Sequence, residues 1–231
     1  MPELLGRAAM QRPDQIALIA PGRPGLTYRE LAAHVAGMQS ALSGLGLGRE
    51  DRVALVLPNG PEMAAAFLGV ACSAACAPLN PDYRAEELEF YLSDLGVKAV
   101  VVEAGSDSPA RAVARSRGIA VIELASSPSA AAGAFSLSGG NGRAAASRPA
   151  EAGDIALLLH TSGTTSRPKL VPLLHRNLCA SADTIARTLR LSPDDCCLSI
   201  MPLFHIHGLV AALLSSLSAG GTVVCAGSFS T

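Results

Sequence analysis

Val97-Lys-Ala-Val-Val-Val-Glu103 and Arg52-Val-Ala-Leu-Val-Leu57 are two short, almost continuously apolar stretches of this 231-residue chain. Such stretches are typical of parallel strands that are buried on both faces of a sheet. Residues 119–124 and 155–159 have the same character, and helix-like segments lie between the apolar stretches. This alternation predicts an α/β fold in which a mostly parallel sheet is flanked by helices.

Helix-start and helix-stop signals occupy the segments between the expected strands. Thr27 and Glu30 form a T-x-x-E capping box, which predicts a helix whose N-cap is Thr27. Asn59 is expected to cap the next helix, with Pro61 in the first turn. A further helix is predicted over residues 84–95, where leucines fall on one face and a glycine follows.

The composition excludes several classes of protein. Hydrophobic residues make up 49% of the chain and charged residues 16%, which is far from a disordered composition. The formal net charge is −1, so the chain lacks the basic field that a nucleic-acid partner needs. The uncharged stretches 63–81 and 196–231 are interrupted by Pro, Ser and paired Gly residues. They are therefore expected to be buried core segments, and no membrane span is predicted.

The cysteines and the N-terminus favour a cytoplasmic protein. The six cysteines have no C-x-x-C spacing, so no metal site is expected, and buried reduced thiols are the simplest interpretation. A disulfide or a metal role is the alternative. The first residues carry charges and have no apolar core of the kind that a secretory signal requires.

Residues 126–150 differ from the rest of the chain. Ser, Ala, Gly and Pro fill 20 of these 25 positions. Such a composition predicts a flexible connection or an exposed loop. The segment is either a domain boundary or a long loop inside one domain. The second is favoured, because the strand pattern resumes directly after it.

A polar loop follows the apolar stretch 155–159. Hydroxyls and a glycine backbone can donate to phosphate oxygens, and a lysine can offset their charge. The loop offers all three, in Thr161, Ser162, Gly163, Thr164, Thr165 and Lys169. Ligands of parallel sheets gather where strands end, which suits this position. No Walker sequence is present, and a solvated Ser/Thr turn is the alternative.

Two motifs resemble those of the adenylate-forming (AMP-binding) superfamily. Thr161-Ser-Gly-Thr-Thr-Ser-Arg-Pro-Lys169 is similar to its phosphate-binding signature, and Pro202-Leu-Phe-His-Ile-His-Gly208 to its second motif. Asn80 matches a further family segment, x-x-P-L-N-P. The two main motifs look most like the oxalate–CoA ligase branch. Leu170 stands where the family has a glycine, and a positive φ there would cost a leucine about 1–2 kcal/mol. An unrelated phosphate-binding module would require both motifs to be coincidental.

The resemblance implies a two-step ligase reaction that uses ATP, Mg²⁺ and coenzyme A. A small carboxylic acid, with oxalate favoured, attacks the α-phosphate of ATP, and a thiol then displaces AMP. The β- and γ-phosphates would be held by Thr161, Ser162, Gly163, Thr164, Thr165 and Lys169. His205 would be the catalytic residue bordering the adenylate, and Phe204 and His207 would shape the acid pocket.

The family's catalytic unit is about twice as long as this chain. The Y-G-x-T-E and Y-x-T-G-D segments of the family are absent, as is its C-terminal lysine domain. Residues 1–231 are therefore expected to be the N-terminal portion of an adenylation domain. The missing half, or another subunit, would cover exposed apolar surface. The alternative is a non-catalytic remnant that binds nucleotide or a partner. A peroxisomal location stays open for a full-length parent.

Overall fold

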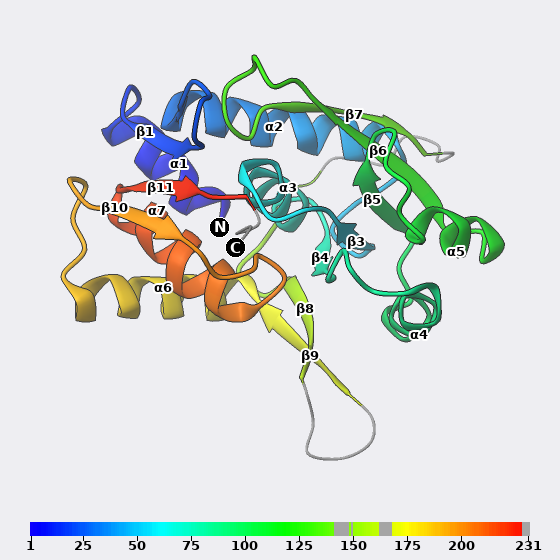
Figure 1. Ribbon diagram of the computed structural model, residues 1–231. Helices are drawn as coiled ribbons and strands as arrows, with labels where there is room; N and C mark the ends of the chain where they lie inside the picture. Colours follow the sequence, from blue (N-terminus) through cyan, green and yellow to red (C-terminus); the bar gives the residue numbers. More distant parts are fainter. Residues whose placement is uncertain (141–147, 149, 162–167, 228–231) are drawn as a thin grey trace.

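The computed structural model describes residues 1–140, 148, 150–161 and 168–227. Its larger sheet has seven strands in the order β7-β6-β5-β3-β4-β8-β9 (Figure 1). These strands are β3 (Arg52–Val56), β4 (Ala75–Pro78), β5 (Ala99–Glu103), β6 (Ala120–Ser126), β7 (Phe135–Gly139), β8 (Ile155–Thr161) and β9 (Lys169–Leu174). The five inner strands are parallel, and the edge strands β7 and β9 run antiparallel to their neighbours. The predicted mostly parallel sheet is confirmed.

A second, four-stranded sheet joins the two ends of the chain. Its order is β10-β11-β1-β2, formed by β10 (Cys196–Ser199), β11 (Thr222–Cys225), β1 (Ile16–Ile19) and β2 (Leu26–Thr27). β1 lies parallel to β11, with Leu18 opposite Val223. The sequence analysis did not anticipate β1 and β2, because strands of four and two residues carry too little pattern to be read.

Helices cover both faces of the larger sheet. They are α1 (Pro2–Gln11), α2 (Tyr28–Gly44), α3 (Pro61–Ala71), α4 (Ala85–Leu95), α5 (Ala110–Ser116), α6 (His175–Leu189), the π-helix η1 (His207–Leu214) and α7 (Ser215–Ala219). Side chains alternate along β3: Val53 and Leu55 join the core cluster that includes α2 and α3, whereas Ala54 and Val56 join the cluster of α4 and α5. The sheet is thus buried on both faces, as its apolar strands predict.

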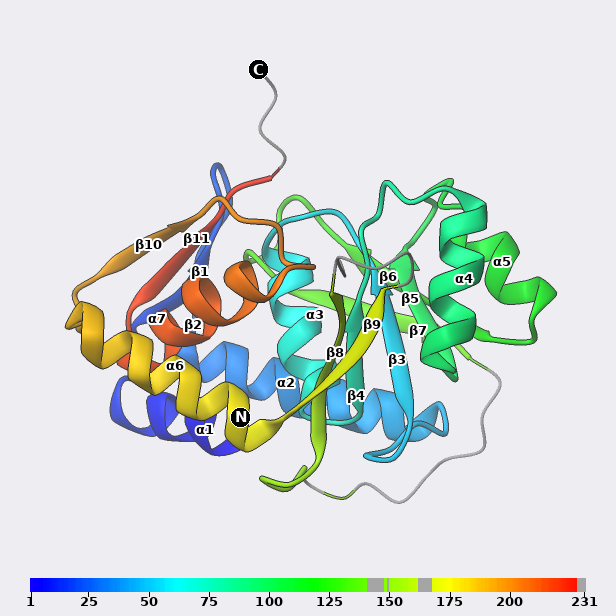
Figure 2. The same cartoon turned by 90° about the horizontal axis from the view of Figure 1, so that it is seen from below.

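Helix α3 packs between the two sheets (Figure 2). All of its residues are buried except Glu62 in the first turn. This position explains the uncharged stretch 63–81 as core, as expected. No helix in the described part of the chain is both long and apolar enough to cross a bilayer.

Of the two predicted helix N-caps, the structure contains one. The capping box of α2 is confirmed: the Thr27 hydroxyl accepts from the Glu30 amide at 3.2 Å, and the Glu30 carboxylate accepts from the Thr27 amide at 2.8 Å. The predicted cap of α3 is wrong. Gly60 is the N-cap and no side chain caps it, while Pro61 does open the helix. Asn59 is instead engaged in distant contacts.

The prediction of a loop over residues 126–150 needs correction. Residues 135–139 form β7, which pairs antiparallel with β6. Phe135 packs against the main core and meets the His34 ring edge-on, with ring centroids 4.6 Å apart. Ala132 is fully buried. The small residues of this segment let its backbone approach the core closely. A composition that is typical of loops is therefore also compatible with a packed edge strand. Residues 141–147 and 149 lie outside the described part.

Candidate functional site

The strands β8 and β9 form a hairpin that carries the two described ends of the predicted phosphate loop (Figure 1). Thr161 is the last residue of β8 and pairs with Lys169, the first residue of β9. The Thr161 hydroxyl donates to the Lys169 carbonyl at 3.5 Å, and both residues are exposed. Ser162, Gly163, Thr164 and Thr165 lie outside the described residues.

Lys169 is available to an anionic ligand. Among the residues that the structure describes, no acidic side chain forms an ion pair with it. Other basic groups do have acidic partners; Lys98, for example, lies 3.1 Å from Asp51. An exposed, unpaired ammonium at the carboxyl end of a parallel strand is well placed to meet phosphate oxygens.

Leu170 causes no strain at the end of this loop. It pairs with His160 inside β9, and among the described non-glycine residues only Arg190 has a positive φ. The possible cost of a left-handed leucine therefore does not arise. The Leu170 side chain packs against the smaller core cluster, which also receives Tyr83 and Tyr91. A leucine thus gains packing contacts that a glycine would lack.

The second motif forms a tight turn that leads into η1. The His205 amide donates to the Pro202 carbonyl at 3.1 Å, and the Leu209 amide donates to the His205 carbonyl at 3.1 Å. Leu203 is buried and anchors the turn. Phe204 is half-buried, with its ring 4.7 Å from that of His205. His205 and His207 are exposed, so their imidazoles are open to a ligand.

The second motif lies near the β8–β9 hairpin. Figures 1 and 2 both place the connection between β10 and η1 next to the end of β8. Among the described residues, however, no hydrogen bond, ion pair or ring contact joins Thr161 or Lys169 to His205 or His207. The polar groups of Thr161 and Lys169 are therefore not paired with those of the two histidines.

Asn59 is the residue at this site whose role the sequence analysis misassigned. Its side-chain oxygen accepts from the Leu203 amide at 3.0 Å, and its amide group lies 3.4 Å from the Ala226 carbonyl. It thus ties the second motif to the β3–α3 turn. Its position after a central parallel strand was a usable signal, because polar residues there face the ligand-binding edge of the sheet.

Replacing Asn59 by alanine is expected to lower the free energy of unfolding by about 1–2 kcal/mol, because the Leu203 amide loses its acceptor. Urea unfolding measures this. Asn80→Ala is the matched control, since the Asn80 side chain serves only a local turn to Asp82 and its removal should cost about 0.5 kcal/mol or less. Equal losses in the two variants would contradict the role given to Asn59.

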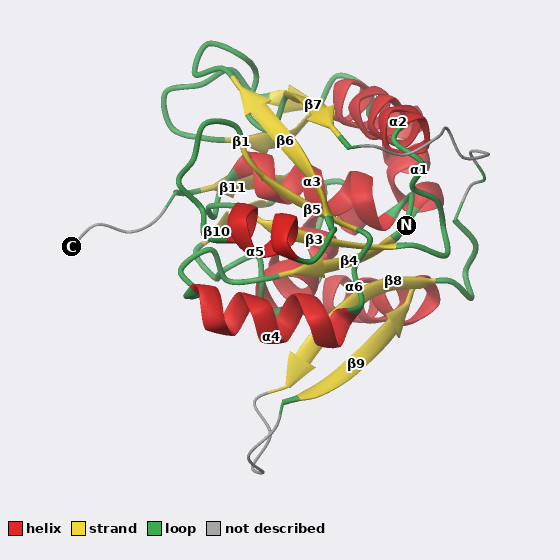
Figure 3. Cartoon of the chain, turned by 90° about the vertical axis from the view of Figure 1, so that its right-hand side faces the viewer, coloured by secondary structure: helices red, strands yellow, loops and turns green. Residues whose placement is uncertain are grey.

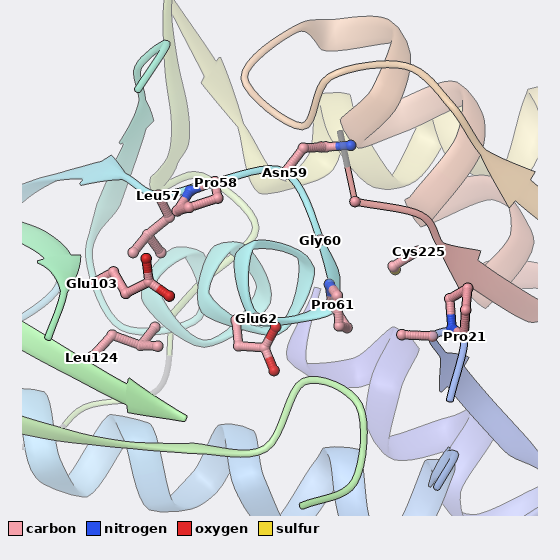
Figure 4. Close-up of a pocket in the computed structure, with 12 residues that line it drawn as sticks. Pro21, Leu57, Pro58, Asn59, Gly60, Pro61, Glu62, Glu103, Leu124 and Cys225 are labelled. Carbon is pink, nitrogen blue, oxygen red and sulfur yellow. The ribbon is translucent and has the colours of Figure 1, made fainter. Parts of the chain in front are cut away.

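A cavity of about 370 Å³ opens beside Asn59, where both sheets end (Figure 4). Glu103 of β5 and Glu62 of α3 lie on one side, and Cys225 and Pro21 lie across from them. Glu62 pairs with Arg23 at 2.5 Å, which leaves the Glu103 carboxylate as the exposed charge. Burial raises the pKa of the Cys225 thiol to about 12, so this thiol stays protonated and unreactive.

This cavity is not a good pocket for an acid. None of the predicted site residues that the structure describes lines it, and the Glu103 carboxylate would repel a second carboxylate. No three His, Cys, Asp or Glu side chains gather closely enough to hold a metal ion in the described part of the chain. The groups suited to an anionic substrate are therefore Lys169 and the two exposed histidines.

The fold is that of an α/β domain of the adenylate-forming type. A family model described as "AMP-binding enzyme" matches residues 5–231, and the chain belongs to this family. It is 41% identical to the "Probable CoA ligase CCL9" of Humulus lupulus over 98% of its length. It is also 39% identical to an oxalate–CoA ligase of Arabidopsis thaliana over 98%, and 36% identical to one of Saccharomyces cerevisiae over 91%.

The solved structures agree with this assignment. The apo MatB structure from Rhodopseudomonas palustris superposes with a TM-score of 0.81 and 27% identity over 99% of the chain. An ATP-bound MatB structure gives a TM-score of 0.80. The chain spans 44% of the Humulus relative, 45% of each oxalate–CoA ligase and 46% of MatB. It therefore corresponds to less than half of each relative.

Proposed function

We propose that this chain is the N-terminal portion of an AMP-forming acid–CoA ligase, which activates a carboxylic acid with ATP and passes it to coenzyme A. The observation that carries the proposal is the exposure of Thr161 and Lys169 on the β8–β9 hairpin and of His205 and His207 on the nearby connection between β10 and η1. The reaction mainly needs charge stabilisation and positioning, and free cationic and hydroxyl groups supply both.

The proposed roles follow from the resemblance of the two motifs and from the exposure of Thr161, Lys169, His205 and His207. Lys169 and Thr161, with Ser162, Gly163, Thr164 and Thr165 between them, hold the β- and γ-phosphates of ATP. His205 borders the adenylate as the catalytic residue, and Phe204 and His207 shape the acid pocket. Mg²⁺ would accompany ATP through its phosphate oxygens, which neutralises charge that Lys169 alone cannot offset.

Oxalate or another small acid is the proposed substrate. Two of the relatives carry the name oxalate–CoA ligase, and a further relative, 32% identical, is a sulfoacetate–CoA ligase of Cupriavidus necator. These acids carry a second anionic group. The exposed imidazoles of His205 and His207 can donate hydrogen bonds to such a group. A cytoplasmic location belongs to the same proposal, and a tagged protein in fractionated cells would test it.

A substrate panel tests the function. The protein that carries this sequence at the full length of its relatives should release pyrophosphate from ATP with oxalate faster than with acetate, a fatty acid or a cinnamate. Release with another acid alone would replace oxalate as the substrate. If none of the acids in the panel causes pyrophosphate release, the ligase assignment is overturned.

A non-catalytic chain is the second candidate, favoured by one observation. Four large apolar side chains are exposed on β10 and the turn after it: Leu198 and Ile200 at 56%, Ile206 at 44% and Met201 at 36%. Leu198 lies in β10, and Ile200 directly follows the strand. A patch of this kind marks a surface that another part of a protein covers. We propose that the remaining half of the ligase, or another subunit, packs there.

The 231-residue chain alone is therefore expected to bind an apolar dye such as anilinonaphthalene sulfonate and to associate as its concentration rises. The double variant Leu198→Ser, Ile200→Ser should lower both signals, because it removes the two most exposed side chains of the patch. Fluorescence titration and sedimentation measure these properties. A dye-silent monomer at all concentrations would count against a covered surface.

A further inference from the structure

His160 is the residue directly before the predicted phosphate loop, and it is held by a distant helix. Its Nε2 atom lies 2.8 Å from a carboxylate oxygen of Asp94, which is on α4. The His160 side chain is only 7% exposed. A carboxylate can only accept, so Nε2 carries the proton and donates it to Asp94. The hydrogen bond links residues 66 positions apart in the sequence.

Aromatic rings fix the orientation of this imidazole. The Tyr91 ring meets it edge-on with centroids 4.8 Å apart, and Tyr91 is itself stacked on Tyr83 at 4.8 Å. Phe90 approaches from the same helix, with its centroid 6.3 Å from that of His160. Rings packed in this way restrict the His160 side chain to the geometry that points Nε2 at Asp94.

The other described end of the loop borders a cavity that α4 also lines. Pro168 lines a cavity of about 440 Å³ together with α4 residues that include Phe90 and Asp94. Figure 3 shows α4 running alongside the β8–β9 hairpin. The hairpin is thus tied to α4 through His160, while Pro168 borders the cavity beside the same helix.

We propose that His160, oriented by Asp94, is a positioning residue that fixes Thr161 and Lys169 for contact with a nucleotide polyphosphate. The inference rests on the proposed function. His160 precedes Thr161 directly and pairs with Leu170, which follows Lys169 directly. The α4 contact therefore sets the position of both phosphate-facing residues. Without the contact between His160 and Asp94, the end of the hairpin is held only by the pairing of β8 with β9. Thr161 and Lys169 then lose the fixed geometry that phosphate binding requires.

The variants separate positioning from packing. His160→Phe keeps a ring against Tyr91 but loses the hydrogen bond, and Asp94→Ala removes the acceptor. Asp94→Asn keeps an acceptor oxygen and should rescue. Glu89→Ala is the matched control, because Glu89 is on the same helix but its carboxylate pairs with Arg117 and not with His160. We expect His160→Phe and Asp94→Ala to weaken ATP binding about 10- to 100-fold, and Asp94→Asn and Glu89→Ala to bind like wild type.

Two readouts keep this inference apart from the proposed function. ATP affinity is measured by calorimetry with Mg²⁺ present, and amide hydrogen exchange is measured along β8 and β9. In His160→Phe and Asp94→Ala, exchange should rise at the ends of β8 and β9 and not in β3. Unchanged exchange in both variants would overturn the positioning role. Faster exchange with no ATP binding by the wild type would retain the anchor and overturn the phosphate assignment instead.

Discussion

Methionine in place of Lys169 is expected to lower kcat/KM for ATP by about 100- to 1,000-fold in the full-length ligase, with little change in stability. The ammonium is exposed and has no acidic partner among the described residues, so folding does not depend on it. Its charge would instead act on the phosphates, where negative charge shifts as pyrophosphate leaves. Initial rates of pyrophosphate release at varied ATP measure the effect.

The chain offers a matched control for this variant. Lys98 is the only other lysine in the sequence, and it lies beside Asp51 and the Gly46 carbonyl, on contacts separate from those of the β8–β9 hairpin. Lys98→Met should leave kcat/KM unchanged within about twofold, since a surface ion pair contributes little. A comparable loss of activity in both variants would show that Lys169 has no special role.

Alanine in place of Gly208 is expected to lower the free energy of unfolding by about 3 kcal/mol. A Cβ atom at this position would lie 2.5 Å from the Pro202 carbonyl oxygen and 2.9 Å from that of Met201. Both are backbone atoms of the turn that carries Phe204 and His205, so the turn must shift to make room. Urea unfolding measures the loss, and acid-dependent pyrophosphate release should fall with it.

Gly37→Ala is the control for this substitution. Gly37 lies inside α2, and a Cβ atom there meets nothing within 4 Å. Alanine is the better helix former, so this variant should gain about 0.5–1 kcal/mol. A Gly208→Ala protein as stable as wild type would mean that the second motif is not held as closely against its own backbone as the structure has it.

The predictions that succeeded concern features encoded within a few residues. The capping box at Thr27 and Glu30 is a local motif, and its hydrogen bonds form as expected. The apolar stretches became β3, β5, β6 and β8 because a continuous apolar strand can only be satisfied inside a two-sided sheet. The family assignment rested on two motifs and was confirmed over residues 5–231.

The features that were missed depend on contacts between distant parts of the chain. β1 is too short to be predicted from its own sequence, and it forms a strand by pairing with β11, about 200 positions later. Asn59 looked like a helix cap because its long-range acceptor role toward Leu203 is invisible locally. The strand β7 was hidden because small residues favour both loops and tightly packed edges. Sequence pattern carries local preference, and tertiary pairing overrides it.

The central claim is that the end of the β8–β9 hairpin holds the β- and γ-phosphates of ATP. Calorimetric titration of the 231-residue chain with ATP and with AMP, each with Mg²⁺, tests it most directly. The account predicts that ATP binds more tightly than AMP and that Lys169→Met removes this difference. Equal affinities for ATP and AMP in the wild type, or a difference that survives Lys169→Met, would contradict it.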